Sequence, residues 1–240
     1  MNKGTNTLSI LHCAIIRHGN YQQLAHTPSA LQPFPLNSQG KQQALAGAKE
    51  LASLLDKHEC MLAPQVDSSN LLRAWQTATI FIDELQQYFT STPTLSGYDA
   101  LAERSVGSAA NLSIEQINAI LAADPRFPAP PENWKSDSHY CLPLQGAESL
   151  LQAGQRVKQH LTDWANASAA TTTSKTVKLF FGHGAAFRHG AHHLGLLPFD
   201  KIAALSMYHA RPIMFKVEDG QFSHIDGSWK IRQATDIPID

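Results

Sequence analysis

Two histidines, each followed by a glycine, stand at the ends of two strongly apolar segments. Residues 8–16 run into Arg17-His18-Gly19, and residues 176–181 run into Gly182-His183-Gly184. Short apolar runs of this kind are typical of strands that are covered on both faces of a parallel sheet. Ligands of such sheets bind beyond the carboxyl ends of the strands. If the two strands are neighbours, the arginine and the two imidazoles share one crevice, which suits an anionic ligand.

Two further segments bring an arginine and a carboxylate to the same kind of position. Arg73 lies in the first turn of a helix that follows an expected strand at residues 61–66. A guanidinium beside the free N–H groups of a helix start is a ready site for phosphate. Glu103 follows a weak strand candidate at residues 94–98 and is a candidate general acid. The plainer interpretations are that Arg73 is a surface cation and that Glu103 pairs with Arg104.

The remaining histidines carry weaker signals. His189, His192 and His193 share one face of an expected helix, but no glutamate lies between them as in a metalloprotease helix, so no metal site is expected. His209 follows an expected strand and is a further candidate for lining the crevice. The sequence contains no Gly-x-Ser-x-Gly, phosphate-loop or Gly-x-Gly-x-x-Gly motif, which argues against a serine hydrolase, an NTPase and a dinucleotide-binding protein.

Strands and helices alternate along most of the chain, as the periodicity of the apolar residues indicates. Helices are expected from residues 37–39 to 55, and at residues 71–89, 113–122, 148–164 and 185–194. Further strands are expected at residues 205–208, 213–217 and 222–225, the last two joined by a hairpin at Asp219-Gly220. The alternation predicts an α/β protein with three layers, α/β/α, and a mostly parallel, doubly wound sheet with the hairpin at its edge. We expect residues 1–240 to form one domain, with residues 97–146 as an irregular flap over the site.

Composition argues against several classes of partner. The 240 residues carry a formal net charge of -1, which gives no electrostatic case for nucleic acid or an acidic membrane. No apolar run approaches the ~20 residues that span a bilayer. Cys13, Cys60 and Cys141 are far apart, so a disulfide framework is not expected and a cytoplasmic setting fits. Residues 3–16 resemble a short signal peptide but lack a small-residue cleavage site.

The motifs taken together resemble the histidine phosphatase superfamily, also called phosphoglycerate mutase-like. No single motif is specific, but their order along the chain is. The matching segments are Arg17-His18-Gly19, then Leu36, Gly40 and Gln43-Ala44, then residues 68–74 with Thr77-Ala78, then residues 101–104 with Gly107, then Gly146, Glu148-Ser149-Leu150 and Arg156, and finally Gly182-His183-Gly184.

The resemblance implies a phosphatase that needs neither a metal nor another cofactor. His18 would attack phosphorus through a neutral ring nitrogen and become a transient phosphohistidine. Arg17 and Arg73 would bind the phosphoryl oxygens, together with Gly184, and His183 would add a donor. Glu103 would protonate the leaving alkoxide and then activate water.

The branch of the superfamily can also be read from this resemblance. The acid-phosphatase branch takes its proton donor from an Asp just after the second histidine, whereas Gly184-Ala185 follows His183 here. Glycolytic mutases carry an Asn six positions after the nucleophile, and this position is Leu24; the Lys after their Glu loop has no match in residues 108–111. A phosphatase acting on a small phosphorylated metabolite is therefore expected. The alternatives are a phosphoglycerate mutase-type phosphotransferase and a catalytically weak relative that binds a phosphorylated ligand. The sequence indicates no oligomeric state.

Overall fold

A six-stranded sheet forms the centre of the computed structural model, which describes residues 10–169 and 175–233. Its strands are β1 (Leu11–Arg17), β2 (Met61–Ser69), β3 (Thr94–Tyr98), β4 (Thr176–Gly182), β6 (Pro212–Glu218) and β7 (Gln221–Asp226). Their order across the sheet is β3-β2-β4-β1-β6-β7. β3, β2, β4 and β1 run parallel to one another. β6 runs antiparallel to β1, and β7 runs antiparallel to β6. The expected mostly parallel sheet with an edge hairpin is therefore confirmed.

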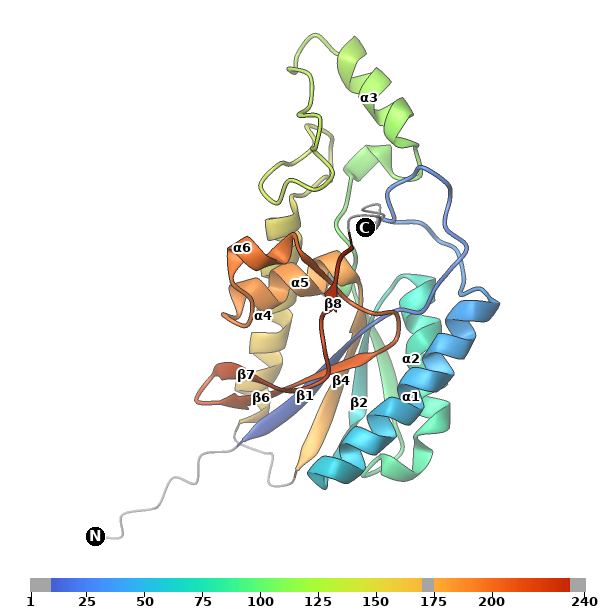
Figure 1. Ribbon diagram of the computed structural model, residues 1–240, viewed down its shortest axis with the longest axis vertical. Helices are drawn as coiled ribbons and strands as arrows, with labels where there is room; N and C mark the ends of the chain where they lie inside the picture. Colours follow the sequence, from blue (N-terminus) through green and yellow to red (C-terminus); the bar gives the residue numbers. More distant parts are fainter. Residues whose placement is uncertain (1–9, 170–174, 234–240) are drawn as a thin grey trace, which may run out of the picture.

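Helices cover both faces of this sheet, as Figure 1 shows. The helices are α1 (Ser38–His58), α2 (Leu72–Glu84), α3 (Ile114–Ala123), α4 (Leu150–Ser168), α5 (Gly184–His193) and α6 (Phe199–Ile202), with 3₁₀ helices at Gln86–Tyr88, Asp99–Leu101 and Gly107–Ala109. α1 and α2 pack on one face, where Ala14 and Ile16 of β1 point, and α4 and α5 pack on the other, where Cys13 and Ile15 point. Burial on both faces explains why β1 is a continuous apolar run, and it confirms the α/β/α layering.

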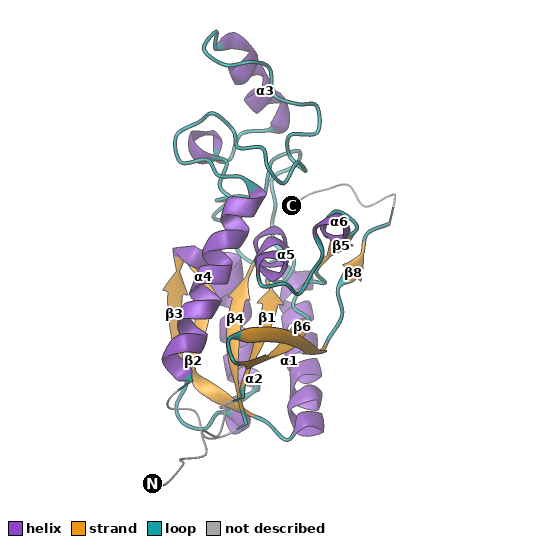
Figure 2. Cartoon of the chain, turned by 90° about the vertical axis from the view of Figure 1, so that its left-hand side faces the viewer, coloured by secondary structure: helices purple, strands orange, loops and turns teal. Residues whose placement is uncertain are grey.

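The register of β1 and β4 brings the two histidine motifs together. Arg17 is paired with Gly182, and the backbone N–H of His18 donates to the Gly182 carbonyl at 3.0 Å. The two histidines therefore leave the sheet at the same edge, beside the first turn of α5. Figure 2 shows the arrowheads of β1, β3 and β4 pointing toward this edge.

The edge hairpin and a small second sheet complete the carboxyl-terminal part. β6 and β7 meet at Asp219 and Gly220, whose φ angles of 52° and 74° are those of a tight hairpin turn. β5 (Leu205–Ser206) does not extend to residue 208 as expected, and it pairs with β8 (Lys230–Ile231) rather than with the central sheet. The short β8 was not anticipated because two residues carry no periodic pattern.

Of the residues expected to form a flap, 97–98 belong to β3 and 99–101 to a 3₁₀ helix, and the later ones share a small core with Ala30. Val106, Ile117, Leu121, Trp134 and Leu142 are buried together in it. The helices of this segment are α3 and two 3₁₀ helices, and all of them end by Ala123. From residue 124 to 146 the segment contains no helix, as its prolines predict. It projects from the carboxyl edge of the sheet (Figure 1).

Some element bounds differ from expectation. β2 continues to Ser69 because its last residues pair with β3 and β4. α2 ends at Glu84 and gives way to a 3₁₀ turn, and α4 begins after a Ser149 capping box and extends to Ser168. Among the described residues, no helix is long and apolar enough to span a bilayer.

Candidate active site

His18 is buried just beyond the end of β1 and has a defined orientation. Its Nδ1 atom lies 2.7 Å from the Gly19 carbonyl oxygen, which can only accept, so we assign the ring proton to Nδ1. The Nε2 atom therefore carries a lone pair. Burial lowers the pKa of His18 well below its usual value, and the nearby Arg73 lowers it further. The ring is thus held neutral, which a nucleophilic imidazole requires.

Arg73 presents one edge of its guanidinium to both histidines. Nε donates to Nε2 of His18 at 3.3 Å, and Nη2 lies 3.2 Å from Nδ1 of His183. This is the two-donor edge with which arginine binds phosphate and carboxylate. Arg73 is completely buried, and burial lowers its pKa. The sequence placed Arg73 in the first turn of a helix, and the structure places it between the two imidazoles rather than at the surface.

The opposite side of the Arg73 guanidinium is anchored by backbone. Nη1 donates to the Gln32 carbonyl at 2.8 Å, and Nη2 lies within 3.2 Å of the carbonyls of Ser29 and Ala30. The ring of Tyr21 lies against it, 4.5 Å from the guanidinium carbon. We call residues 29–32 the anchoring segment. Sequence reasoning missed it, because it acts through carbonyls that every residue type has.

His183 lies beside His18, with 4.9 Å between the ring centroids. Its Nε2 atom is 2.9 Å from Ser69 Oγ, and its Nδ1 faces Arg73. Burial, and then Arg73, lower its pKa well below the usual value, so the ring is neutral. With Arg73 as donor, Nδ1 accepts and the ring proton is on Nε2. Donation to a phosphoryl oxygen, as expected from sequence, needs the other tautomer, for which the Ser69 hydroxyl can donate to Nε2.

Arg17 and Gly184 occupy adjoining positions at the same edge. Arg17 donates from Nη1 to the carbonyl of Met207 at 3.1 Å. Gly184 is the first residue of α5, and a Cβ atom there would lie 3.2 Å from Cδ of Arg17. A glycine therefore lets the arginine side chain pass the helix start closely. A helix start suits an anion, and the N–H of Ala186 in this first turn already donates to the carboxylate of Glu103.

Glu103 is buried against α5. Its Oε1 accepts from the backbone N–H groups of Ala186 at 3.2 Å and of Arg104 at 2.9 Å. The side chain of Arg104 instead reaches the Lys135 carbonyl, so the plain Glu103–Arg104 side-chain ion pair is absent. The Glu103 carboxylate attracts the Arg73 guanidinium electrostatically. It therefore lies at the start of the helix that follows His183, at the side of the phosphate-binding candidates.

The other histidines divide into two groups. His209 adjoins the site, because its Nδ1 lies 2.9 Å from the His18 carbonyl oxygen and the two rings are 5.6 Å apart. His189, His192 and His193 each bind a backbone carbonyl through one ring nitrogen. Within the described ranges, no group of three or more His, Cys, Asp or Glu side chains is arranged to hold a metal ion.

Comparisons with known proteins identify the family and the fold. The sequence matches the histidine phosphatase superfamily (branch 1) over residues 13–226. No curated protein gives a significant match. Among solved structures, the mycobacterial glucosyl-3-phosphoglycerate phosphatase is similar, with 20% identity, a TM-score of 0.66, and coverage of 90% of this chain and 97% of that chain. A phosphoglycerate mutase from Bacillus anthracis str. Sterne is similar, with 16% identity, a TM-score of 0.68, and coverage of 92% and 93%. These likenesses support the fold, and the match to the superfamily covers most of the chain: the protein belongs to the histidine phosphatase superfamily (branch 1).

Proposed function

We propose that this protein hydrolyses a small phosphomonoester through a phosphohistidine intermediate on His18. One observation carries the proposal: the lone pair on Nε2 of a neutral His18 faces the two-donor edge of Arg73. A nucleophile and an anion-binding group are thus aimed at the same point. A phosphoryl group that enters between them meets the attacking nitrogen and the charge that stabilises it.

The first chemical step transfers the phosphoryl group to His18. Nε2 forms a bond to phosphorus while the bond from phosphorus to the ester oxygen breaks. Arg17 and Arg73 hold the phosphoryl oxygens, and their two positive charges offset the charge of the transferring group without a metal ion. A protonated Glu103 gives its proton to the leaving oxygen, so the product departs as an alcohol.

The second step releases phosphate. The Glu103 carboxylate takes a proton from water, the water oxygen forms a bond to phosphorus, and the bond between phosphorus and Nε2 breaks. His18 returns to its neutral form with its proton still on Nδ1. The absence of the Asn and Lys of glycolytic mutases, at Leu24 and residues 108–111, favours water over a second substrate as the acceptor.

The cellular compartment of the protein is inferred from its cysteines. Cys13 and Cys60 are buried, Cys141 is exposed, and all three are free. Free, widely separated cysteines are typical of a reducing compartment, so we infer that the enzyme is cytoplasmic. Its proposed partner is the substrate itself, a small phosphorylated metabolite.

Phosphate release from p-nitrophenyl phosphate and from a panel of phosphometabolites tests the proposal. We expect release that is unchanged by a chelator and lost in His18→Ala. The exposed His224 offers a matched control, and His224→Ala should keep the activity. Loss of activity with the chelator, or retention in His18→Ala, contradicts the mechanism. Interconversion of phosphoglycerates with a bisphosphate primer and no net phosphate release would instead identify a mutase.

A further inference from the structure

Arg156, in the second turn of α4, binds the backbone of the segment that carries Glu103. Its guanidinium donates to four backbone carbonyls in residues 99–103, to three of them from Nη1 and to one from Nη2. They are the carbonyls of Asp99 at 3.3 Å, Ala100 at 2.9 Å, Ala102 at 2.8 Å and Glu103 at 3.0 Å. Backbone carbonyls outside regular structure need such partners. One side chain therefore holds the main chain up to the proposed proton donor.

Glu148 binds both Arg156 and the chain that follows Glu103. Its Oε2 accepts from Nε of Arg156 at 3.1 Å, and its Oε1 accepts from Nη2 at 2.6 Å. Oε1 also accepts from the N–H of Ser105 at 2.9 Å, and the Ser105 carbonyl accepts from the N–H of Glu148 at 3.0 Å. We call Arg156 and Glu148 the loop clamp. The loop clamp binds the chain on both sides of Glu103.

The carboxylate of Glu103 is held separately, at the other end of its side chain. Its Oε1 accepts from the N–H of Ala186 in α5 at 3.2 Å. The contacts of Arg156 with residues 99–103, in contrast, are made to backbone oxygens. The loop clamp therefore sets where the main chain of Glu103 lies, and the carboxyl group remains the part that can exchange a proton.

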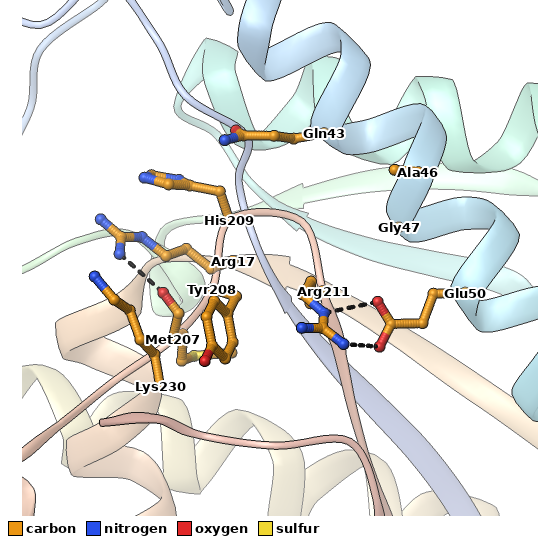
Figure 3. A pocket seen from close by; sticks show the side chains of 10 residues that line it. All are labelled: Arg17, Gln43, Ala46, Gly47, Glu50, Met207, Tyr208, His209, Arg211 and Lys230. Carbon is orange, nitrogen blue, oxygen red and sulfur yellow. Dashed lines mark hydrogen bonds and ion pairs between the residues drawn. The ribbon is translucent and has the colours of Figure 1, made fainter. Parts of the chain in front are cut away.

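Two further arginines of the site are also held by backbone carbonyls. Arg73 binds the carbonyls of the anchoring segment. Figure 3 shows Arg17 directed at the carbonyl of Met207, beside a cavity of about 410 Å³ that Lys230 also lines. A guanidinium has five donors in a fixed plane, so it can bind several carbonyls at once. Arg17 and Arg73 are proposed to hold the phosphoryl group, whereas Arg156 holds the segment of the proposed acid.

The partial exposure and the charge of Arg156 make it suitable for substitution. The side chains of Arg156 and Glu148 are 25% and 19% exposed, so a smaller side chain leaves no void in the hydrophobic core. Burial, then Arg73, and then Arg156 lower the pKa of His183. Arg156→Lys keeps this positive charge and removes the planar donors. It therefore separates the geometry of the segment from the electrostatics of the site.

We propose that Arg156 is a positioning residue for proton transfer, and that with Glu148 it holds residues 99–105 so that the Glu103 carboxyl group reaches the leaving oxygen. The proton passes from Glu103 to this oxygen as the bond from phosphorus to the oxygen breaks, and Arg156 itself forms and breaks no covalent bond. This inference rests on the proposed function. It gives the two residues of the loop clamp a role in the first chemical step.

The leaving group of the substrate tests this role. Benzyl phosphate and p-nitrophenyl phosphate are similar in size, but the benzyl alkoxide must be protonated as it departs, whereas p-nitrophenolate is a weak base. Because kcat/KM covers the steps up to this departure, its ratio for benzyl phosphate over p-nitrophenyl phosphate measures proton donation. We expect Arg156→Lys to lower this ratio about tenfold or more, since misplacing a reacting group by about 1 Å can cost ~10²-fold. A merely structural role would lower kcat/KM for both esters alike, and an unchanged ratio overturns the proposal.

A double variant connects the effect to Glu103. A carboxyl group that has been removed cannot be misplaced, so in the Glu103→Gln background Arg156→Lys should change the ratio by less than about twofold. A further fall of about tenfold in this background would show that Arg156 acts independently of Glu103, and it overturns the proposal. Arg126→Lys, at the exposed ion pair with Asp124, is the matched control and should keep the wild-type ratio.

Glu148→Gln provides the same test if Arg156→Lys does not fold, as circular dichroism and urea unfolding would show. The amide can still accept from the N–H of Ser105, but it lacks the charge that binds Arg156. We expect the ratio to fall about threefold or more, because hydrogen bonds between charged groups are roughly twice as strong as neutral ones. A wild-type ratio in folded Glu148→Gln overturns the proposal.

The same measurements separate this inference from the proposed function. Phosphate release that is lost in His18→Ala, together with an unchanged ratio in Arg156→Lys, contradicts the role of Arg156 and leaves the hydrolytic function intact. Absence of phosphate release from both esters in the wild-type protein contradicts the hydrolytic function, and this inference with it.

Discussion

Nε of Arg73 lies 3.3 Å from Nε2 of His18, so the cation hydrogen-bonds the lone pair that is proposed to attack phosphorus. In this arrangement the phosphoryl group must enter between the two side chains and replace one hydrogen bond by several. The anchoring segment keeps the guanidinium in place while this happens, because its carbonyls hold the opposite side.

Replacing Arg73 by lysine should therefore affect both catalysis and stability. An ammonium group cannot present two parallel donors, so we expect kcat/KM for p-nitrophenyl phosphate to fall by about 10²–10³. In Arg73→Lys the carbonyls of the anchoring segment lose the guanidinium donors that now bind them. This loss should lower the free energy of unfolding by about 1–3 kcal/mol. Steady-state kinetics and urea unfolding measure the two effects. Arg126→Lys, at an exposed ion pair in the flap, should change neither, and wild-type kinetics in Arg73→Lys would refute the assigned position.

Glu103→Gln tests the proton donor through the leaving group. The amide can still accept from the N–H of Ala186, but it has no proton to give at neutral pH. Phosphate release from an alkyl phosphate, whose alkoxide must be protonated, should fall by about 10²–10⁴. Release from p-nitrophenyl phosphate, whose leaving group is a weak base, should fall much less. Equal losses for the two substrates would argue that Glu103 has a structural role only.

The buried histidines should make stability depend on pH below 6.5. The pKa of His18 in the folded protein is far below its usual 6.5, so the unfolded chain binds a proton first as pH falls. Stability then decreases from about pH 6.5 down to the folded pKa, by up to about 1.4 kcal/mol per pH unit for one such group. Urea unfolding at pH 6.5, 6.0, 5.5 and 5.0 gives the free energy of unfolding as a function of pH. The slope of this free energy against pH should be smaller for His18→Gln than for the wild type.

An identical slope in His18→Gln would mean that His18 takes up its proton equally well in the folded and unfolded chains. It would remove the case for a neutral, buried nucleophile. Because the comparison uses slopes, a uniform loss of stability in the variant does not affect it.

Lys178 and Asp67 form a buried ion pair that lies apart from the proposed chemistry. Nζ is 2.5 Å from Oδ1, and the other oxygen of Asp67 is 2.8 Å from Nε2 of His160 on α4. Lys178→Met leaves the carboxylate buried without its lysine, and we expect the free energy of unfolding to fall by about 3–5 kcal/mol. The double variant Asp67→Asn/Lys178→Met should recover most of this loss. Equal losses in the single and double variants would show that packing, rather than charge, dominates at this position.

The sequence was most informative where residue type and position act together. The apolar residues of β1 and β4 predicted two buried strands with histidines at their carboxyl ends, and the pairing of the two strands, which the sequence left as a condition, comes from the structure. His209 was a candidate because a strand was expected at residues 205–208, but β5 ends at Ser206 and belongs to the small second sheet, so the position of His209 has a different origin.

The parts that could not be predicted depend on backbone atoms or on very short elements. The carbonyls of residues 29–32 anchor Arg73, and no residue type marks a carbonyl. Tyr21 lies against Arg73 because the irregular loop after β1 carries its ring there, and the course of such a loop has no periodic signal. Lys230 reaches the cavity because two residues pair with β5, a contact between distant parts of the chain that has no periodic signal.

The most direct measurement is to trap the phosphoenzyme. The protein is mixed with p-nitrophenyl phosphate, quenched within milliseconds in alkali, where a phosphorus–nitrogen bond survives, and mapped by mass spectrometry of its peptides. We predict one acid-labile phosphoryl group, located on His18, that forms before free phosphate accumulates and is absent from His18→Ala. Steady hydrolysis without any phosphoenzyme, or a phosphoryl group on another residue, would contradict His18 as the nucleophile.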